Sequence, residues 1–295
     1  MRPIPSVAAI VVNWNLPDLT LACIAALRAS LYPRLQIVLV DNGSTSGCLA
    51  TLRRAAPDCT LLALPYNRGF AAAANAGIRH ALAADADYIL LVNNDAVAAP
   101  DMLALLVAEA QADARAGIVA PLILYQDAPA RIWRLGDRER AWLPIPRALW
   151  RDARVDAAPT QPLDVDYVTG CGMLVRRELI EQLGGFDERF TMYYEDADLC
   201  RRARQAGYRI RVVPVARLWH KVSQSARIDR PATALLWMRS RVLFYRSKAT
   251  GLRRAVTEGF VLVTGLRDVL VAAIRGERQL ALALLRGFAA GYTAR

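Results

Sequence analysis

Residues 184–202 read GGFDERFTMYYEDADLCRR, and this stretch sets how the rest of the chain is interpreted. A group of carboxylates, Glu195, Asp196 and Asp198, leads directly into two arginines. Acids in the first turn and arginines further along suit the dipole of a helix, and Gly207 is a plausible end for it. We therefore expect a loop that brings acids to the start of a helix. Alone, the pattern fits a structural helix as well as a functional site.

Short apolar runs rich in Val and Ile alternate with helix-like segments along the first 225 residues. Such runs are typical of strands that are buried on both faces, and their alternation with helices of 10–15 residues predicts βαβ units with a mostly parallel sheet. The strands are expected at residues 6–12, 36–40, 61–64, 88–92, 118–124, 165–175 and 209–213, the sixth with an interruption at Gly170-Cys171-Gly172.

Polar clusters follow four of these strands: Asn13-Trp14-Asn15, Asp41-Asn42-Gly43-Ser44, Asn67-Arg68-Gly69-Phe70 and Asn93-Asn94-Asp95. Ligands of open α/β sheets bind at the carboxyl ends of the strands, so we expect the site along this edge. Two of the clusters also fit simple turns or loops, because Asn-Gly favours tight turns. In the functional interpretation, Asp41 accepts the imide N–H of a pyrimidine, Arg68 contacts base or phosphate, and Gly69 permits close backbone approach.

Asp95 and His220 are candidates for a metal site. A carboxylate directly after a buried strand suits Mg²⁺ or Mn²⁺, which prefer oxygen ligands and often take only one or two protein carboxylates. His220 follows the last strand and would complete a mixed nitrogen and oxygen site, with Lys221 and Ser223 near enough to contact phosphate. The other histidine, His80, is expected to be structural.

Two further segments stand out. Residues 126–163 have little periodicity but several Trp, Arg and Pro residues, which indicates a long functional loop. Residues 226–295 read as helical and carry thirteen Lys or Arg against four Asp or Glu, a large part of the net charge of +11. The apolar stripe Phe260, Val263, Leu266, Leu270 and Ile274 either packs on the chain's own domain or lies on anionic lipid.

Composition excludes several classes of protein. The five cysteines form no CxxC pair, which favours a reduced chain without a zinc site. We expect no spanning helix, because uninterrupted apolar runs of about 18 residues are missing. The turn after the first strand lacks the G-x-G-x-x-G of a dinucleotide-binding dehydrogenase. No zinc finger or RNA-binding signature supports a nucleic-acid partner.

Seven motifs in chain order carry a resemblance to a known family: VVNWN, DNGS, NRGFAAAAN, NND, TGCGMLVRRE, GGFDERFTMYYEDADLCRR and WHKVSQS. From residue 6 to about residue 225 the chain resembles the family 2 glycosyltransferases of GT-A fold. Within them it is most similar to the bacterial rhamnosyltransferase-like branch that builds cell-surface polysaccharides. The resemblance implies a GT-A domain at residues 1–225 and a basic, amphipathic helical segment at residues 226–295.

The resemblance also implies roles for individual residues. Asp196 would be the general base and Glu195 would orient the acceptor. Asp95, at the position of the family's DxD motif, and His220 would hold Mg²⁺ or Mn²⁺. The nucleotide would contact Asn13, Asn15, Asp41, Arg68, Gly69, Asn93 and Asn94.

The implied reaction is an inverting, metal-dependent transfer of a sugar from a dTDP- or UDP-sugar, with dTDP-rhamnose favoured, to a saccharide or lipid-linked acceptor. A base removes the acceptor proton while the metal ion stabilises the departing diphosphate. The expected location is the cytoplasm, on the inner face of the membrane through residues 226–295. The alternatives are a degenerate relative that binds nucleotide or membrane without catalysis, and a nucleotidyltransferase, whose usual Gly-rich, basic opening turn is missing.

Overall fold

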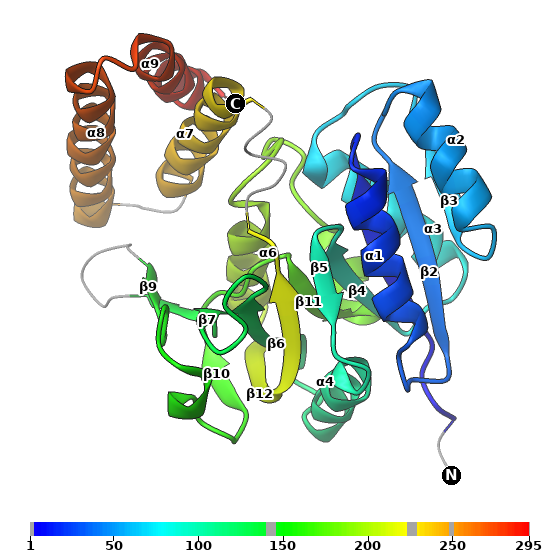
Figure 1. Ribbon diagram of the computed structural model, residues 1–295. Helices are drawn as coiled ribbons and strands as arrows, with labels where there is room; N and C mark the ends of the chain where they lie inside the picture. The colour runs from blue at the N-terminus through cyan, green and yellow to red at the C-terminus, as the bar shows by residue number, and fades with distance from the viewer. Residues whose placement is uncertain (1–2, 140–145, 223–228, 248–250, 295) are drawn as a thin grey trace.

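The computed structural model describes residues 3–139, 146–222, 229–247 and 251–294, with side chains from residue 254 onward in the last range. Strands and helices alternate along the first 220 residues, and three helices follow (Figure 1). The strands are β1 Val7–Asn13, β2 Leu35–Asp41, β3 Thr60–Ala63, β4 Tyr88–Asn93, β5 Ala96–Ala98, β6 Ala116–Tyr125, β7 Ile132–Arg134, β8 Asp137–Glu139, β9 Pro146–Ala148, β10 Leu163–Val165, β11 Gly172–Arg176 and β12 Arg209–His220. The helices are α1 Pro17–Arg28, α2 Ser46–Ala55, α3 Phe70–Ala83, α4 Met102–Ala112, the 3₁₀ turn η1 Val155–Ala157, α5 Arg177–Leu183, α6 Glu195–Gln205, α7 Arg230–Arg246, α8 Gly251–Ile274 and α9 Arg278–Thr293.

A central sheet has the strand order β10-β12-β6-β11-β4-β1-β2-β3. Strands β1 to β4 are parallel where they pair, and β12 runs parallel to β6. β11 is antiparallel to both β4 and β6, and β10 is antiparallel to β12. The prediction of a mostly parallel sheet flanked by helices is confirmed.

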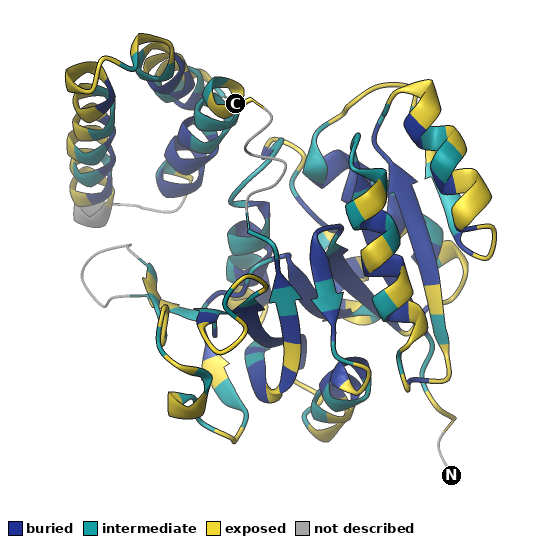
Figure 2. Ribbon diagram, in the orientation of Figure 1, coloured by how far each residue is buried: buried dark blue, intermediate teal, exposed yellow. Residues whose placement is uncertain are grey.

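Each face of the sheet is covered by helices. In β1, Val7, Ala9 and Val11 face a core that α1, α2 and α4 complete, whereas Ala8 and Ile10 face a core that includes α3, α5 and α6. Figure 2 shows the strands buried at the centre and the exposed residues on the outer sides of the helices. A strand buried on both faces has no polar alternation, which is why the sequence shows these strands as continuous apolar runs.

Helix α3 lies very close to the sheet. A Cβ atom added at Gly77 would come within 2.6 Å of Ile10 Cγ2, so this helix is restricted to small residues where it crosses β1. The alanine-rich sequence of residues 70–83 reflects this close packing. The packing holds the first residues of α3, including Phe70, at the carboxyl edge of the sheet.

Two parts of the chain differ from the sequence prediction. The strand expected at residues 165–175 is wrong in its first part, because β10 ends at Val165 and pairs with β12 at one edge, whereas β11 begins at Gly172 and lies between β6 and β4. The predicted interruption at residues 170–172 coincides with a turn in which the carbonyl of Thr169 accepts a hydrogen bond from the amide of Gly172, but the sequence did not indicate that the two parts pair with different strands. The predicted loop at 126–163 is an ordered arm, defined here as residues 126–139 and 146–163, in which β7 pairs with β6 and β8 pairs with β9.

Helix α7 packs against the segment that carries the acids. Ser240 Oγ donates to the carbonyl of Met192 at 2.8 Å, and Phe244 joins the main core beside Tyr194. The proposed boundary between residues 225 and 226 lies outside the described residues, and α7, the first helix after it, contacts the first part of the chain. In the part of the chain that the structure describes, no helix is long and apolar enough to cross a membrane.

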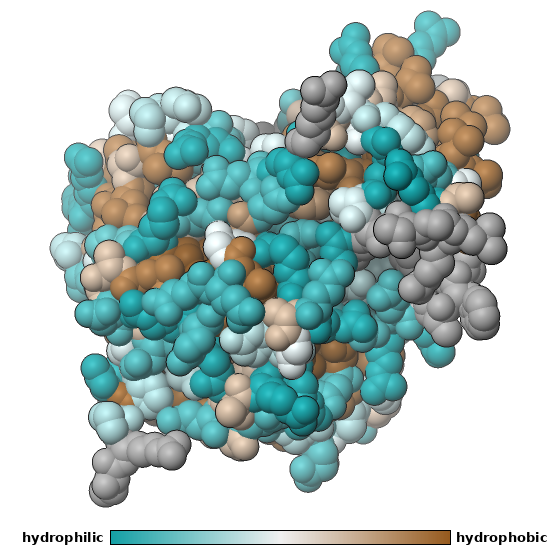
Figure 3. Space-filling model, turned by 180° about the vertical axis from the view of Figure 1, so that it is seen from behind, coloured by the Kyte–Doolittle hydropathy of each residue, from teal (hydrophilic) through white to brown (hydrophobic). Residues whose placement is uncertain are grey.

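Helix α8 buries part of its polar surface and leaves several apolar side chains exposed. The buried Arg241 of α7 pairs with Asp268 Oδ2 at 3.0 Å and also bonds to Thr264, so the α7–α8 interface contains a buried polar cluster. Val263, Leu266, Leu270 and Ile274 are exposed, whereas Phe260 is half-buried against Tyr245. Of the five residues in the predicted stripe, Phe260 therefore packs against the core and the other four are exposed. Figure 3 shows apolar atoms gathered over the C-terminal helices, at the upper right.

Candidate active site

The two acids at the start of α6 are held by a strained turn. Tyr193 and Tyr194 have φ angles of +69° and +67°, a left-handed conformation that bulky residues rarely adopt. Glu195 and Asp196 follow as the first residues of the helix. The N-terminal end of a helix favours negative charge, which partly offsets the cost of burying acids at this turn.

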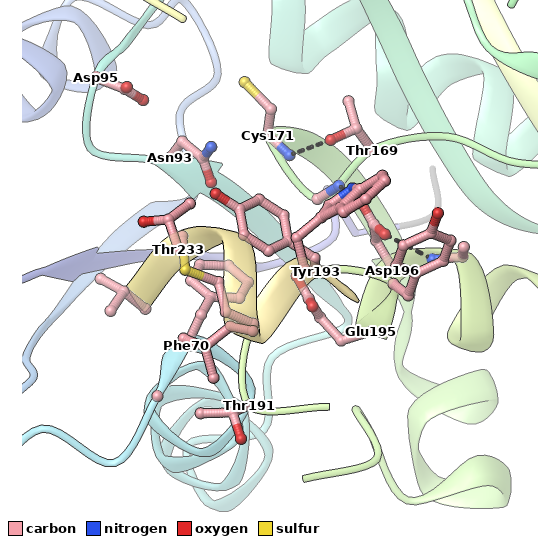
Figure 4. Close-up of a pocket in the computed structure, with 18 of the residues that line it drawn as sticks. Phe70, Asn93, Asp95, Thr169, Cys171, Thr191, Tyr193, Glu195, Asp196 and Thr233 are labelled. Atoms are coloured by element: carbon pink, nitrogen blue, oxygen red, sulfur yellow. Dashed lines mark hydrogen bonds between the residues drawn. The ribbon is translucent and has the colours of Figure 1, made fainter. Parts of the chain in front are cut away.

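Asp196 faces the pocket with both oxygens held by backbone amides. Gly170 N donates to Oδ2 at 3.0 Å, and Ala197 N donates to Oδ1 at 2.7 Å (Figure 4). Burial raises the pKa of Asp196 above the usual range of aspartate, and these amide hydrogen bonds oppose the rise. The result is a fixed carboxylate that is more basic than an exposed one.

Glu195 lies deeper than Asp196. It is buried, and its Oε2 has no hydrogen-bond partner in the described structure. Burial, and then the charge of Asp196, raise the pKa of Glu195 well above its usual value. Of two neighbouring acids in different surroundings, the one with the less polar environment keeps its proton. Asp196 is therefore the acid that carries the charge.

Asp198, the third acid of the group, points away from the pocket. Its side chain is 4% exposed and is paired with Arg201 and, at 2.6 Å, with Arg202 Nε. Arg202 also donates to the carbonyls of Leu183 and Gly185. These contacts connect α6 to the loop before it, so Asp198 and its two arginines are structural.

Asp95 and His220 meet although 125 positions separate them in the sequence. Asp95 lies between β4 and β5, and His220 ends β12, which pairs with β5. His220 Nε2 is 2.9 Å from Asp95 Oδ1, and both side chains are buried. His220 Nδ1 has no hydrogen-bond partner in the described structure, and the imidazole ring packs on Trp133 with ring centroids 4.5 Å apart.

This pair would offer one carboxylate and one imidazole to a metal ion. No cluster of three or more His, Cys, Asp or Glu side chains that could hold a metal occurs among the described residues. Mg²⁺ and Mn²⁺ are commonly bound by one or two protein groups, with phosphate oxygens and water completing the shell. The residues present therefore fit an ion that binds together with a diphosphate, and not one that the protein encloses alone.

The loops after β2 and β3 form a second side of the pocket. Asn42 Oδ1 accepts the amide of Arg68 at 2.9 Å, while Asn42 Nδ2 donates to Asn67 Oδ1 and to the carbonyl of Gly69. Arg68 forms an ion pair with Glu188 at 3.5 Å. Arg68 and Gly69 thus line the pocket as predicted for residues close to a ligand.

Three of the residues predicted to contact nucleotide lie behind the pocket wall. Asn13 Nδ2 donates to Asp41 Oδ1 at 2.7 Å, and Asp41 Oδ2 accepts the amide of Ser44 at 3.1 Å. Asn15 Oδ1 accepts the amide of Thr45 at 2.9 Å. These bonds shape the loop after β2, and Asn13, Asn15 and Asp41 are not among the residues that line the pocket. Their contact with nucleotide stays a prediction.

The remaining predicted residues come together in one pocket of about 1220 Å³. Asn93, Asn94, Asp95, Glu195, Asp196 and His220 line it along with Arg68 and Gly69. In Figure 4, Asp95 and Asp196 lie on opposite sides of the drawn group, with Asn93 and Tyr193 between them. The volume exceeds that of a usual small-ligand site and leaves room for two substrates. Ser223 lies outside the described residues.

Sequence reasoning missed part of the wall. Arg134, Asp137 and Arg151 come from the arm, as does Trp133, and for this segment the Trp, Arg and Pro content had indicated a functional loop without assigning roles. Thr233, Leu236 and Trp237 come from α7, and no sequence signal pointed to them. Helix periodicity indicates which residues share a face, but it does not indicate which neighbour that face meets.

The sheet, the pocket at its carboxyl edge and the placement of the acids define a glycosyltransferase of GT-A fold that uses a nucleotide sugar. The chain belongs to glycosyl transferase family 2, whose family model matches residues 8–184. A relative from Mycobacterium tuberculosis named N-acetylglucosaminyl-diphospho-decaprenol L-rhamnosyltransferase is 30% identical over 79% of this chain and 81% of its own length. The predicted family and fold are thereby confirmed.

Solved structures agree on the fold. A mannosyltransferase from Pyrobaculum calidifontis, solved with GDP-mannose and Mn²⁺, matches 99% of this chain and 88% of its own, with 20% identity and a TM-score of 0.59. The structure of GalNAc-T7 with UDP, GalNAc and Mn²⁺ matches 75% of this chain and 44% of its own, with 18% identity and a TM-score of 0.57.

Proposed function

We propose that the enzyme transfers rhamnose from dTDP-rhamnose, with inversion, to a saccharide on a lipid-linked acceptor during cell-surface polysaccharide synthesis. The name of the Mycobacterium tuberculosis relative supports both the sugar and the acceptor class. The observation that carries the proposal is that Asp196 and the Asp95–His220 pair line one pocket from opposite sides. Inversion requires the acceptor and the leaving group to lie on opposite faces of the sugar.

In this proposal Asp196 removes the proton of the acceptor hydroxyl as that oxygen attacks the anomeric carbon. The amides of Gly170 and Ala197 fix the carboxylate so that it does not need to reorient during the reaction. Glu195 stays protonated beneath it, which avoids a second negative charge beside the developing alkoxide. Glu195 thereby orients the acceptor side of the site without competing as a base.

On the opposite side, Asp95 and His220 would hold Mg²⁺ or Mn²⁺. The bound ion would neutralise charge on the departing diphosphate. Two of the fold neighbours were solved with Mn²⁺, which supports a divalent ion for this chain as well. Arg68, Gly69, Asn93 and Asn94 would contact the nucleotide, while Asn13, Asn15 and Asp41 hold the loop that receives its base.

We also propose that residues 226–295 attach the enzyme to the cytoplasmic face of the membrane, while residues 1–225 carry the catalytic groups. Helix α8 supports this, since Val263 and Ile274 are 67% and 77% exposed while its polar Asp268 faces inward. Arg267 and Arg275 are exposed on the same helix. An outward apolar face with flanking arginines suits the boundary of an anionic bilayer, where a lipid-linked acceptor resides.

The first test is protection of the full chain against thermal unfolding. Nucleoside diphosphates and sugar nucleotides are compared in the presence of Mn²⁺, Mg²⁺ or EDTA, because a ligand that binds only the folded state raises its stability. We expect metal-dependent stabilisation that is largest with dTDP-rhamnose. Sugar transfer from that donor to an N-acetylglucosaminyl diphosphate lipid then checks the acceptor. No stabilisation by any nucleotide would contradict the proposal and favour a degenerate relative.

A further inference from the structure

The arm brings a second group of charges into the pocket that the proposed reaction does not use. Arg134 ends β7, and Arg151 follows the β8–β9 hairpin. Both line the pocket, as does Asp137 between them in the sequence. The arm is anchored because β7 pairs with β6 and the amide of Asp137 donates to the carbonyl of Tyr167 at 2.9 Å.

The sheet order separates this group from the nucleotide side. Strands β1, β2 and β3 lie at one end of the sheet, whereas β6, which carries the arm, lies beyond β4 and β11. Arg68 therefore enters the pocket from the β3 side, and Arg134 and Arg151 enter it from the other. Trp133 contacts both groups: its ring centroid lies 4.5 Å from that of His220, and the guanidinium of Arg134 lies 5.5 Å from the centre of the indole ring.

Arg134 also lies near the proposed base. Its positive charge favours the ionised form of Asp196 and so acts to lower the pKa of that carboxyl, against the larger effect of burial. An acceptor that places its hydroxyl at Asp196 and extends toward the arm would therefore pass close to the guanidinium of Arg134.

Neither arginine is fully neutralised by its acidic neighbour. Arg134 meets Asp137 through one terminal nitrogen at 3.3 Å, and Arg151 Nε is 3.8 Å from the exposed Asp152. The exposed Arg151–Asp152 pair contributes little, and the Arg134–Asp137 pair uses only one nitrogen of a guanidinium that has five N–H donors arranged in a planar fork. That fork matches the oxygens of a phosphate group and can bind it through two hydrogen bonds.

We propose that Arg134 and Arg151 form an acceptor phosphate subsite, so that the acceptor is a sugar diphosphate whose diphosphate binds these arginines while its hydroxyl reaches Asp196. This inference rests on the proposed function and specifies its acceptor. The same chemistry occurs in the donor diphosphate, which the proposed function assigns to Asp95 and His220. The subsite therefore has to be tested with the donor position filled.

The probe is farnesyl diphosphate, which carries a diphosphate on an apolar chain but no sugar and no base. Its binding to the full chain is measured by calorimetry with and without saturating UDP and Mn²⁺, and farnesol serves as the phosphate-free control. The variants are Arg134→Gln, Arg151→Gln and both together. The matched control is Arg147→Gln, an exposed arginine of β9 that does not line the pocket.

We expect the double variant to bind the probe about ten- to hundredfold more weakly, the range for losing charged hydrogen bonds. Arg147→Gln should bind the probe as tightly as the wild type does. The binding of farnesol should not change when Arg134 and Arg151 are replaced, and the affinity of every variant for UDP should equal that of the wild type. Arg151 is half-exposed, so Arg151→Gln should weaken binding of the probe without lowering the unfolding temperature of the protein.

Three results would overturn the subsite: no binding of the probe, equal binding by wild type and the double variant, or a parallel loss of UDP affinity, which would assign the arginines to the donor. A chain that binds no nucleotide would refute the proposed function instead. In that case the affinity of the probe in the absence of UDP, compared between the wild type and the double variant, would still decide whether the arginines bind a diphosphate.

Discussion

His220 Nε2 lies 2.9 Å from Asp95 Oδ1, although the two residues are 125 positions apart in the chain. β5 and β12 pair antiparallel in a register that sets Ala96 opposite His220. The histidine and the carboxylate are therefore held together by the sheet itself. Any ligand that replaces the hydrogen bond between them finds both side chains already oriented.

Replacing His220 by Ala should weaken metal-dependent binding of nucleoside diphosphate on the order of tenfold or more, because one of two protein groups for the ion is lost. Thermal shifts with UDP in Mn²⁺ and in EDTA measure the effect. The matched control is His80→Ala, a half-buried histidine on α3 that does not line the pocket. Equal metal dependence in wild type and His220→Ala would exclude His220 as a ligand.

Replacing Asp196 by Asn should retain nucleotide binding and lower turnover by about 10²- to 10⁴-fold, the usual contribution of a general base. The side chain of asparagine can accept only one of the two backbone amide hydrogen bonds that Asp196 accepts, so UDP titration serves to check that the donor site stays intact. Substantial remaining turnover would move the base to Glu195, because Asp198 is held by two arginines outside the pocket.

Replacing Glu195 by Gln should stabilise the fold increasingly as pH rises. The folded-state pKa of Glu195 is raised above its ordinary value of 4.5 by burial and by Asp196. A raised pKa means that its stabilising contribution is complete below the unfolded pKa and is lost as pH rises toward the folded one. The difference in unfolding temperature between variant and wild type should therefore grow from pH 5 to pH 8. A constant difference would show that the pKa is not raised.

Replacing Gly69 by Ala should destabilise the protein by about 1–3 kcal/mol, the range for a strained backbone position. Gly69 has a φ of +84°, and an added Cβ would lie 2.6 Å from the carbonyl oxygen of Thr191. The matched control is Gly47→Ala in α2, where nothing lies within 4 Å and alanine should stabilise the helix by roughly 0.5–1 kcal/mol. Denaturant titration distinguishes them, and similar effects at both sites would contradict the predicted strain.

Replacing Leu270 and Ile274 together by Glu should reduce sedimentation with phosphatidylglycerol vesicles. Both side chains are exposed on α8, so the unfolding temperature should change little. Leu31→Glu, at an exposed leucine between α1 and β2, is the control for nonspecific loss of hydrophobicity. If the double variant still sediments with the vesicles as the wild type does, the exposed face of α8 is not the membrane-binding surface.

The sequence alone determined the elements and most acids of the site. Apolar runs and their spacing are local properties of the sequence. They located β1, β2, β4 and β6 because a strand that is buried on both faces consists almost entirely of apolar residues. The parallel arrangement then required the polar ends of these strands to share an edge. Arg68 and Asp95 could be named for this reason, whereas the roles of Glu195 and Asp196 were implied by the resemblance to the family.

Only the tertiary structure decided what these residues meet. Three features depend on contacts across more than 25 positions of sequence. They are the pairing of β10 and β11 with different strands, the position of Arg134 near Asp196 and the contribution of α7 to the pocket. The same holds for α8, whose stripe in the sequence fits either packing or exposure. Its polar Asp268 turned inward because Arg241 of α7 is buried there, and a buried charge requires a partner. Periodicity specifies a face, whereas long-range packing selects the neighbour that covers it.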